Sequence, residues 1–339
     1  MRRCLVWFLI LTLLASPAHA QQTLGCAQTS TIYTYDSMLA DIDILQAEGM
    51  TVQTIGYSLG GEPIKALYLG TGDVYALALA GVHGNENANP AMLMRAMAEL
   101  FARAQSGDEA VLAVLNRCTL VAVPCVNPDG YIRCVDYVSN GRVYYQKGNL
   151  NEVNLNRNFP TPYWGSDAVK GDKNYAGPSA GSEPETQAVV ALMKKHNYGA
   201  MTDIHSKGKQ VYCGKGGFVQ SDLLTSFPVE TLDNMTYILA KALVPEGYRT
   251  RPQAAASRDG GFGSSTDYAF HLGYPGVTIE TISMNQTGPI TPQVINREYE
   301  QINMPQILLN LCGSAVYFSR QMQAAAHNET EEDADARAQ

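Results

Sequence analysis

A long hydrophobic run is missing from the sequence after residue 20, so we expect no membrane anchor in the remaining chain. The run that is present, LVWFLILTLLA, follows Arg2 and Arg3 and precedes the small-x-small sequence Ala18-His19-Ala20. This order is typical of a secretory signal peptide, so residues 1–20 are predicted to be removed on export. The expected location is therefore secreted or periplasmic.

Positive charge is also scarce, with 24 Lys and Arg against 32 Asp and Glu and a formal net charge of -8. No basic stripe offsets this balance, which argues against a nucleic-acid partner. Internal repeats and low-complexity linkers are absent as well, so residues 21–322 are predicted to form one large domain. The remaining residues, 323–339, are acidic and lack apolar periodicity, and they are predicted to be disordered.

Closely spaced cysteines with the Cys-Cys-His-His pattern of a structural zinc site are missing too. Six cysteines remain after the signal peptide: Cys26, Cys118, Cys125, Cys134, Cys213 and Cys312. An even number in an exported protein predicts disulfides, whose pairing the spacing does not determine. The alternative is that some are free buried thiols packed as small hydrophobic residues, as the run LVAVPCV around Cys125 allows.

Apolar periodicity predicts a sheet covered by helices. Nearly continuous apolar runs at residues 74–82, 119–126, 198–204 and 276–282 are typical of strands buried on both faces. Two alternating segments flank Gly60-Gly61 and predict a β-hairpin. Helical patterns cover residues 36–48, 90–104, 184–196, 230–243 and 296–318. This order predicts an α/β fold, a three-layer α/β/α sandwich around a twisted mixed central sheet.

Residues 127–182 lack convincing periodicity and are rich in Asn, Gly, Tyr and Pro. A loop of this length directly after a buried strand is usually functional. At its end, Ser182-Glu183-Pro184-Glu185 is interpreted as a capping box, with Ser182 as N-cap and Glu185 bonding back to it.

Two histidines stand where an apolar strand run gives way to a loop. They are His83, followed three positions later by Glu86, and His205. The other four histidines lie in the signal peptide, the acidic tail, a helix end and an aromatic segment (His19, His327, His196 and His271). Two histidines and one carboxylate leave a tetrahedral zinc ion one open position, as in catalytic sites. H-x-x-E alone is a common pattern, however, because Glu86 could equally begin a helix.

Further motifs follow the sequence HGNE (83–86) in a fixed order: VNPDGY (126–131), NLNRNFP (154–160), GSEPET (181–186), TDIHS (202–206) and VTIET (277–281). Their order and spacing resemble the zinc carboxypeptidase family, from about Thr51 to Glu280. The resemblance implies one Zn²⁺ per chain, held by His83, Glu86 and His205, and Glu280 as the catalytic glutamate. It also implies that Asn156 and Arg157 bind the free C-terminal carboxylate of a peptide substrate.

The chemistry of peptide hydrolysis agrees with these assignments. An amide carbonyl is a poor electrophile, so a metal must polarise it and lower the pKa of a water molecule towards ~7. A carboxylate must then take the proton of that water and deliver it to the leaving amine. Glu280 is the one acidic residue in the apolar run GVTIETI, where a charge is costly unless it faces a polar cavity. The alternatives are a surface pair with a lysine for Glu280 and a structural ion pair for Arg157.

The sequence also departs from the digestive members of the family. Where they place an arginine that stabilises the oxyanion, this chain has Lys147, which supplies a point charge instead of a fork. This lysine context resembles the bacterial cell-wall branch, which cleaves γ-D-glutamyl-diaminopimelate bonds. A mobile family tyrosine is missing from residues 249–266, and Tyr248 and Tyr268 do not align with it. Thr266 matches the base of the specificity pocket, where Asp267 could meet a cationic group of the substrate.

The sequence is therefore interpreted as a secreted zinc metallocarboxypeptidase that acts on peptides or on peptidoglycan stem peptides. Three alternatives stay open: a cell-wall γ-D-glutamyl-diamino acid endopeptidase, an aspartoacylase-like zinc deacylase, and a catalytically dead cell-wall-binding relative. The deacylases share HGNE-like and LNR-like motifs but are normally intracellular, and the NPDGY and SEPET segments argue against them. The complete set of His83, Glu86, His205 and Glu280 argues against a dead relative.

Overall fold

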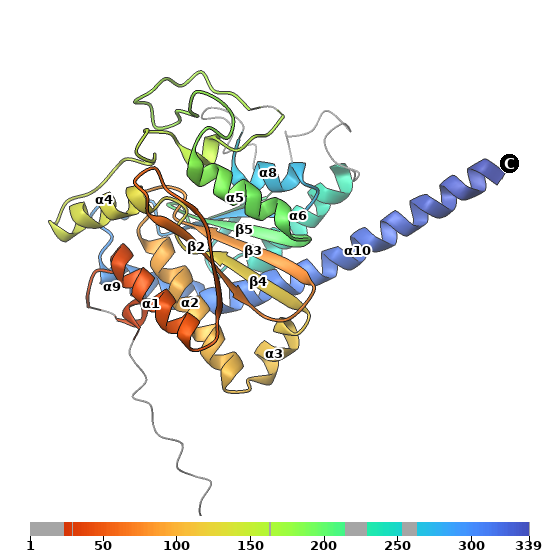
Figure 1. Cartoon of the computed structure of the whole chain (residues 1–339), viewed down its shortest axis with the longest axis horizontal. Helices are drawn as coiled ribbons and strands as arrows, with labels where there is room; N and C mark the ends of the chain where they lie inside the picture. Colours follow the sequence, from red (N-terminus) through yellow and green to blue (C-terminus); the bar gives the residue numbers. More distant parts are fainter. Residues whose placement is uncertain (1–23, 29, 163, 214–228, 253–262, 339) are drawn as a thin grey trace, which may run out of the picture.

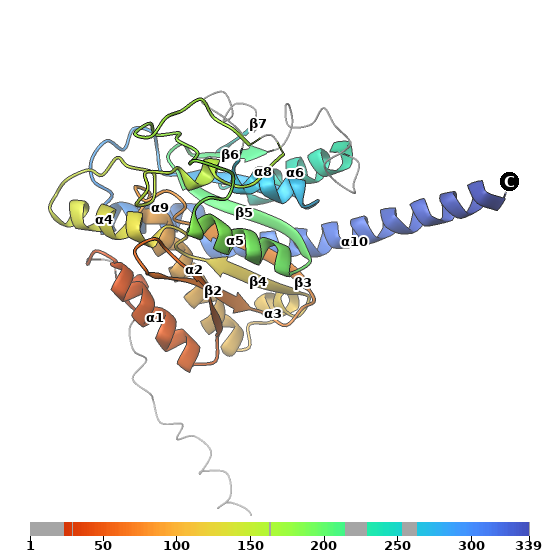
Figure 2. The same ribbon diagram turned by 45° about the horizontal axis from the view of Figure 1, so that its top comes forward.

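The computed structural model describes residues 24–28, 30–162, 164–213, 229–252 and 263–338, the last of these from 324 onward by backbone alone. The predicted signal peptide lies outside the described residues, as do residues 253–262 of the segment without the family tyrosine. In the described part of the chain, a mixed sheet lies between two layers of helices (Figures 1 and 2), which confirms the predicted three-layer α/β/α fold.

The four predicted central strands are present and adjacent. In spatial order the sheet consists of β1 (Thr51–Tyr57), β2 (Pro63–Leu69), β4 (Cys118–Val123), β3 (Val74–Ala80), β5 (Tyr198–Ser206), β8 (Gly276–Thr281), β6 (Gln210–Cys213) and β7 (Arg249–Pro252). Strands β4, β3, β5 and β8 run parallel, and β1 and β2 form the predicted antiparallel hairpin. The last two strands in this order, β6 and the edge strand β7, were not predicted, because four residues are too few to show a periodic pattern.

Helices cover both faces of the sheet. One face packs against α1 (Tyr35–Ala47), α2 (Ala88–Gln105), α3 (Glu109–Leu115), α4 (Pro128–Ser139), α6 (Val229–Leu243), α9 (Pro292–Ile302) and α10 (Met304–Ala338). The other face packs against α5 (Pro184–Lys195) and α8 (Ser265–His271). Side chains along β5 alternate between the two faces of the sheet. Ala200 and Ile204 pack in the core on the α2 and α10 side, and Met201 packs in the core on the α5 and α8 side.

The last predicted helix, residues 296–318, is two helices in the structure. They are separated at Asn303, whose φ of 50° and ψ of 60° place it in the left-handed region that ends a helix. Pro305 then lies in the first turn of α10, where its missing N–H costs no hydrogen bond. α10 continues to Ala338 and projects from the body (Figure 1), and the disorder of residues 323–339 stays a prediction. The Ala and Glu residues of this segment favour helix.

The predicted loop at residues 127–182 also contains structure. Asn127 begins α4 by accepting a hydrogen bond from Gly130 N, and Pro128 occupies its first turn. A short 3₁₀ helix, η2 (Leu155–Arg157), follows, and another, η1 (Gly25–Ala27), starts the described chain. These elements were not predicted, because a capping residue or a proline can mark where a helix starts but does not show how long the helix is.

The predicted capping box at α5 is wrong. Glu183, not Ser182, is the N-cap, and it makes no side-chain capping bond. Pro184 fixes the first helical position, and the Ser182 hydroxyl donates to the Glu183 carboxylate at 2.6 Å. Glu185 bonds instead to Leu59 N, in the β1–β2 turn.

All six cysteines after residue 20 are buried free thiols, so the expected disulfides are not formed and the alternative interpretation holds. Each packs as a small hydrophobic group, and burial raises the pKa of the Cys134 thiol to about 12. Within the described residues, no helix combines the length and the apolar character that crossing a membrane demands.

Candidate active site

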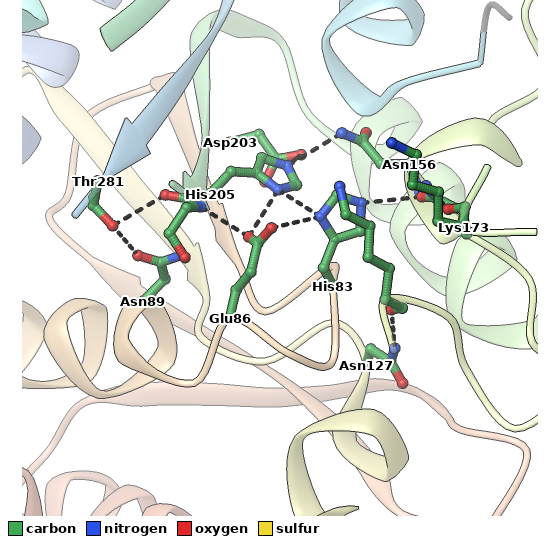
Figure 3. A network of polar contacts seen from close by, with 12 residues as sticks. His83, Glu86, Asn89, Asn127, Asn156, Lys173, Asp203, His205 and Thr281 are labelled. Carbon is green, nitrogen blue, oxygen red and sulfur yellow. Dashed lines mark hydrogen bonds and ion pairs between the residues drawn. The ribbon is translucent and has the colours of Figure 1, made fainter. Parts of the chain in front are cut away.

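The three predicted metal ligands meet at one edge of the sheet (Figure 3). The turn after β3 carries His83 and Glu86 towards α2, and His205 lies near the end of β5. Because β3 and β5 are adjacent and parallel, their carboxyl ends lie at the same edge, where α/β sheets form ligand sites. All three side chains are buried, and their ligand atoms lie within 4.8 Å of one another.

Both imidazole rings turn Nδ1 towards the Glu86 carboxylate. His83 Nδ1 lies 2.7 Å from Oε1, His205 Nδ1 lies 3.1 Å from Oε2, and the two Nδ1 atoms are 3.2 Å apart. In a tetrahedral zinc site with bonds of about 2.0–2.1 Å, neighbouring ligand atoms stand roughly 3.3 Å apart. The observed spacing and the donor set of two imidazoles and one carboxylate therefore fit zinc.

The charge states of His83 and Glu86 also fit a cation. Burial lowers the pKa of His83 to about 4, so its imidazole is neutral at pH 7 and can act as a ligand. Burial opposes the charge on Glu86, but the neighbouring His83 and His205 hold the pKa of this carboxyl well below its usual range. Ser206 N donates to Glu86 Oε2 at 3.0 Å and fixes the carboxylate in place.

The second nitrogen of each ring has its own partner. His83 Nε2 lies 3.0 Å from Asn154 Oδ1, and His205 Nε2 lies 3.0 Å from Asp203 Oδ2. Neither Asn154 nor Asp203 was predicted as a site residue. Asp203 could have been found, because it stands two positions before His205 on a strand and therefore faces the same way.

Glu280 lies on β8 directly beside His205, its register partner across β5 and β8. Its Oε2 atom is buried and lacks a hydrogen-bond partner among the described residues. Burial and the charge of Glu86 raise the pKa of Glu280 to about 7, although His205 and Lys147 act in the opposite direction. A carboxylate with this pKa exchanges a proton readily near neutral pH.

Lys147 belongs to the same site. Its main-chain oxygen accepts a hydrogen bond from Gly84 N at 2.9 Å, and the side chain is half-buried. The positive charge of Lys147 lowers the pKa of both His83 and Glu280, so its field reaches the place where the predicted metal ligands and Glu280 meet. Its predicted role at the oxyanion stays a prediction.

Asn156 and Arg157 lie in η2, behind His205. The Asn156 amide nitrogen is 3.2 Å from His205 Nε2, and its oxygen accepts a hydrogen bond from Ser265 N at 3.0 Å. Arg157 Nη1 donates to the Asn156 carbonyl, and the Arg157 carbonyl accepts from Trp164 Nε1. The amide of Asn156 is thus engaged within the protein, whereas the binding of substrate by Arg157 stays a prediction.

The predicted specificity residues lie at the start of α8. Thr266 is buried, with Oγ1 3.1 Å from Ser264 Oγ. Asp267 completes a capping box: Ser264 N donates to its carboxylate, and its own N–H donates to Ser264 Oγ. The carboxylate of Asp267 therefore caps the helix, and its contact with a cationic substrate group stays a prediction.

The two tyrosines that flank the loop are both fixed. The Tyr248 hydroxyl donates to the Glu298 carboxylate, and Tyr268 is buried in the core between β5 and α5. Both side chains are held within the fold, in agreement with the expectation that neither replaces the mobile family tyrosine.

The GSEPET segment supports the loop that carries Asn154. The Asn149 amide donates to both Glu183 and Glu185, at 2.8 and 3.0 Å, and Asn151 donates to Glu183. Asn149 Oδ1 in turn accepts from Val153 N. The two buried glutamates at the start of α5 therefore position the segment that leads into NLNRNFP.

Several known proteins resemble this chain in sequence. Gamma-D-glutamyl-L-diamino acid endopeptidase 1 of Lysinibacillus sphaericus is 28% identical over 211 residues, which cover 54% of this chain and 52% of that protein. Carboxypeptidase A2 of Mus musculus is 29% identical over 177 residues, covering 48% of this chain and 42% of that protein. The chain thus spans about half the length of these curated relatives.

Solved structures share the fold. The carboxypeptidase A of Helicoverpa armigera superposes with a TM-score of 0.66 at 20% identity, covering 89% of this chain and 78% of that one. Bovine thrombin-activatable fibrinolysis inhibitor gives 0.68 at 19% identity, covering 85% and 99%.

A family model extends this likeness over most of the chain. The model described as zinc carboxypeptidase matches residues 35–304, a range that includes the two imidazoles and the carboxylate at the sheet edge and also Glu280. A match of this extent, together with the shared fold and a donor set that suits zinc, shows that the chain belongs to the zinc carboxypeptidase family.

Proposed function

We propose that the protein is an exported zinc metallocarboxypeptidase that removes one C-terminal residue from peptides, including peptidoglycan stem peptides. The observation that carries the proposal is Glu280 beside the three metal ligands, with a buried carboxylate oxygen that has no partner in the described part of the chain. A carboxylate that only stabilised the fold would be hydrogen-bonded there.

His83, Glu86 and His205 are the residues that would hold one zinc ion. The chemistry that zinc supplies in such a site is Lewis acidity towards a carbonyl and a water molecule. Glu280 takes a proton from the attacking water and passes it to the leaving amine, as a general base and then a general acid. The ammonium of Lys147 stabilises the negative charge that develops on the carbonyl oxygen.

Arg157 supports an exopeptidase. A guanidinium can hold a terminal carboxylate by two parallel charge-assisted hydrogen bonds, while an endopeptidase must leave that space open. The fold brings Arg157 into η2, next to Asn156, which itself contacts His205. Thr266, at the start of α8, is the expected base of the pocket for the terminal side chain.

The second candidate function is cleavage of the γ-D-glutamyl-diamino acid bond within a cell-wall peptide. It is favoured by Lys147 in place of arginine and by the likeness to the Lysinibacillus endopeptidase. The export of the protein rests on the predicted signal peptide in both cases.

Peptidase assays separate the two functions. Peptidoglycan tripeptides and tetrapeptides are incubated beside ordinary peptides with free and amidated C-termini, and the products are identified by mass. Release of a single terminal residue from free-acid peptides supports the carboxypeptidase. Cleavage only at the γ-D-glutamyl bond, at equal rates for free and blocked termini, supports the endopeptidase and overturns the first proposal.

A further inference from the structure

Asp203 stands behind His205, on the side of the ring away from the proposed metal position (Figure 3). It lies two residues before His205 on β5 and on the same face of the strand. Its side chain is fully buried, and Oδ2 lies 3.0 Å from His205 Nε2. The Ser265 hydroxyl, from the first turn of α8, donates to the same carboxylate oxygen.

The two histidines differ in this respect. His83 Nε2 faces the neutral amide oxygen of Asn154, also at 3.0 Å. His205 Nε2 lies closer to the Asp203 carboxylate, at 3.0 Å, than to the Asn156 amide nitrogen, at 3.2 Å, and so has a charged hydrogen-bond acceptor. Each partner accepts a hydrogen bond from Nε2–H, and this leaves the lone pair of Nδ1 free to face Glu86 and a metal ion. Only the carboxylate adds a negative charge that makes the ring a stronger donor to a cation.

Burying the Asp203 carboxylate lowers the stability of the fold unless a positive charge compensates it. The other oxygen, Oδ1, has no hydrogen-bond partner within the described residues, and no lysine or arginine there forms an ion pair with this carboxylate. A buried carboxylate that keeps one oxygen unpaired destabilises a fold unless a positive charge compensates it. A dication held by His205 supplies such a charge at the far side of the ring.

We propose that Asp203 is a positioning residue of the metal centre, which holds His205 in the orientation and tautomer that present Nδ1 to zinc. Ser265 fixes the carboxylate from α8, so the order of the site depends on the packing of α8 against β5. The inference rests on the proposed ligand set but not on the identity of the peptide substrate.

Zinc affinity tests it. The full-length protein is stripped of metal, and its zinc affinity is measured by competition with a chromophoric chelator. Asp203→Asn keeps the shape and removes the charge, and we expect zinc affinity to fall about 10- to 100-fold, as for other partners of metal-bound histidines. Asp41→Asn is the matched control, because Asp41 is also buried and accepts hydrogen bonds from Gly25 N, Cys26 N and Tyr33 in the N-terminal part of the fold. Its zinc affinity should match that of the wild type.

A second test moves the carboxylate from His205 to His83 by mutation. Asn154→Asp supplies a carboxylate to His83, and in combination with Asp203→Asn it should restore part of the lost zinc affinity. Substitution with Co²⁺ gives a spectroscopic measurement, since a displaced His205 changes the ligand-field absorption. If Asp203→Asn does not fold, as thermal unfolding of the metal-free protein would reveal, Ser265→Ala is used instead and should weaken zinc binding to a smaller degree.

Two failures are distinguishable. A wild-type protein that binds no zinc would overturn the ligand set itself. A wild type that binds zinc, with Asp203→Asn and Ser265→Ala binding it equally tightly, would overturn only the role of Asp203.

Discussion

Gly84 and Gly130 meet backbone to backbone: a Cβ atom added to Gly84 would lie 2.7 Å from the Cα of Gly130. Gly84 follows the proposed metal ligand His83, and Gly130 lies in the first turn of α4. The two glycines therefore let the HGNE turn and the NPDGY segment pack in direct contact, 46 positions apart in the numbering. Because backbone atoms cannot give way, the position of His83 depends on this contact.

Gly84→Ala should therefore lower both stability and zinc affinity. Inserting one methyl group into a close-packed site costs about 1–3 kcal/mol in the free energy of unfolding. Chemical denaturation and chelator competition measure the two effects. The control is Gly313→Ala, an exposed helical site with open space around it, which should leave stability unchanged or raise it by up to ~1 kcal/mol. Equal results for the two variants would show that the glycine contact does not matter.

Zinc content should be one ion per chain in the purified wild type. His205→Ala should remove metal and activity together, because three protein ligands hold the ion and two bind it far more weakly. Elemental analysis after dialysis measures the metal. A chelator should abolish activity in the wild type, and added zinc should restore it. Full zinc occupancy in His205→Ala would contradict the ligand assignment.

Glu280→Gln should separate binding from chemistry. The amide keeps the shape but cannot take a proton, so kcat should fall on the order of 10²-fold or more. Zinc content and KM should stay close to the wild-type values. Steady-state kinetics on a chromogenic peptide give both constants. A variant with nearly normal kcat would move the proton transfer to another residue.

Blocking the C-terminus of a substrate should weaken catalysis if Arg157 holds the terminal carboxylate. The loss of about 2 kcal/mol of charge-assisted bonding corresponds to ~30-fold in kcat/KM. Arg157→Ala should reduce activity on the free acid and abolish the difference between free and amidated peptides. Arg157→Lys is the matched variant, since it keeps the charge and loses the fork. Equal rates on both peptides in the wild type would show that the terminus is not recognised.

The raised pKa of Glu185 predicts how the stability of the fold changes with pH. Burial raises the pKa of this carboxyl, with a smaller contribution from Glu183, so the folded state holds the proton more tightly than the unfolded state. The contribution of the Glu185 proton to the free energy of unfolding is therefore complete below the pKa of Glu185 in the unfolded state. It is lost as the pH rises through the pKa of Glu185 in the folded state. Glu185→Gln lacks this titration, so its stability relative to the wild type should rise as the pH increases above about 4. Urea unfolding at several pH values measures the difference, and a difference that falls with pH would contradict the assignment.

The sequence was sufficient to predict the central layer and most of the site. Each central strand is a continuous apolar run, and burial on both faces is a local property that such a run records directly. The cluster of His83, Glu86 and His205 was predictable for a similar reason, because a histidine or glutamate at the end of an apolar strand stands out from its neighbours. The helix break at Asn303 was not predicted, since a single left-handed residue leaves the apolar period almost intact.

Tertiary structure decided the contacts between distant segments. The strand register sets Glu280 beside His205, and the packing of α8 brings Ser265 to Asp203. Asn154 meets His83 across 71 residues, and Asp267 caps the start of its own helix. Spacing along the chain carries no record of these pairs, because they depend on which strands are neighbours and on how the loops pack between them. The sequence alone determined which residues are candidates for the chemistry, and the fold determined which partner each of them has.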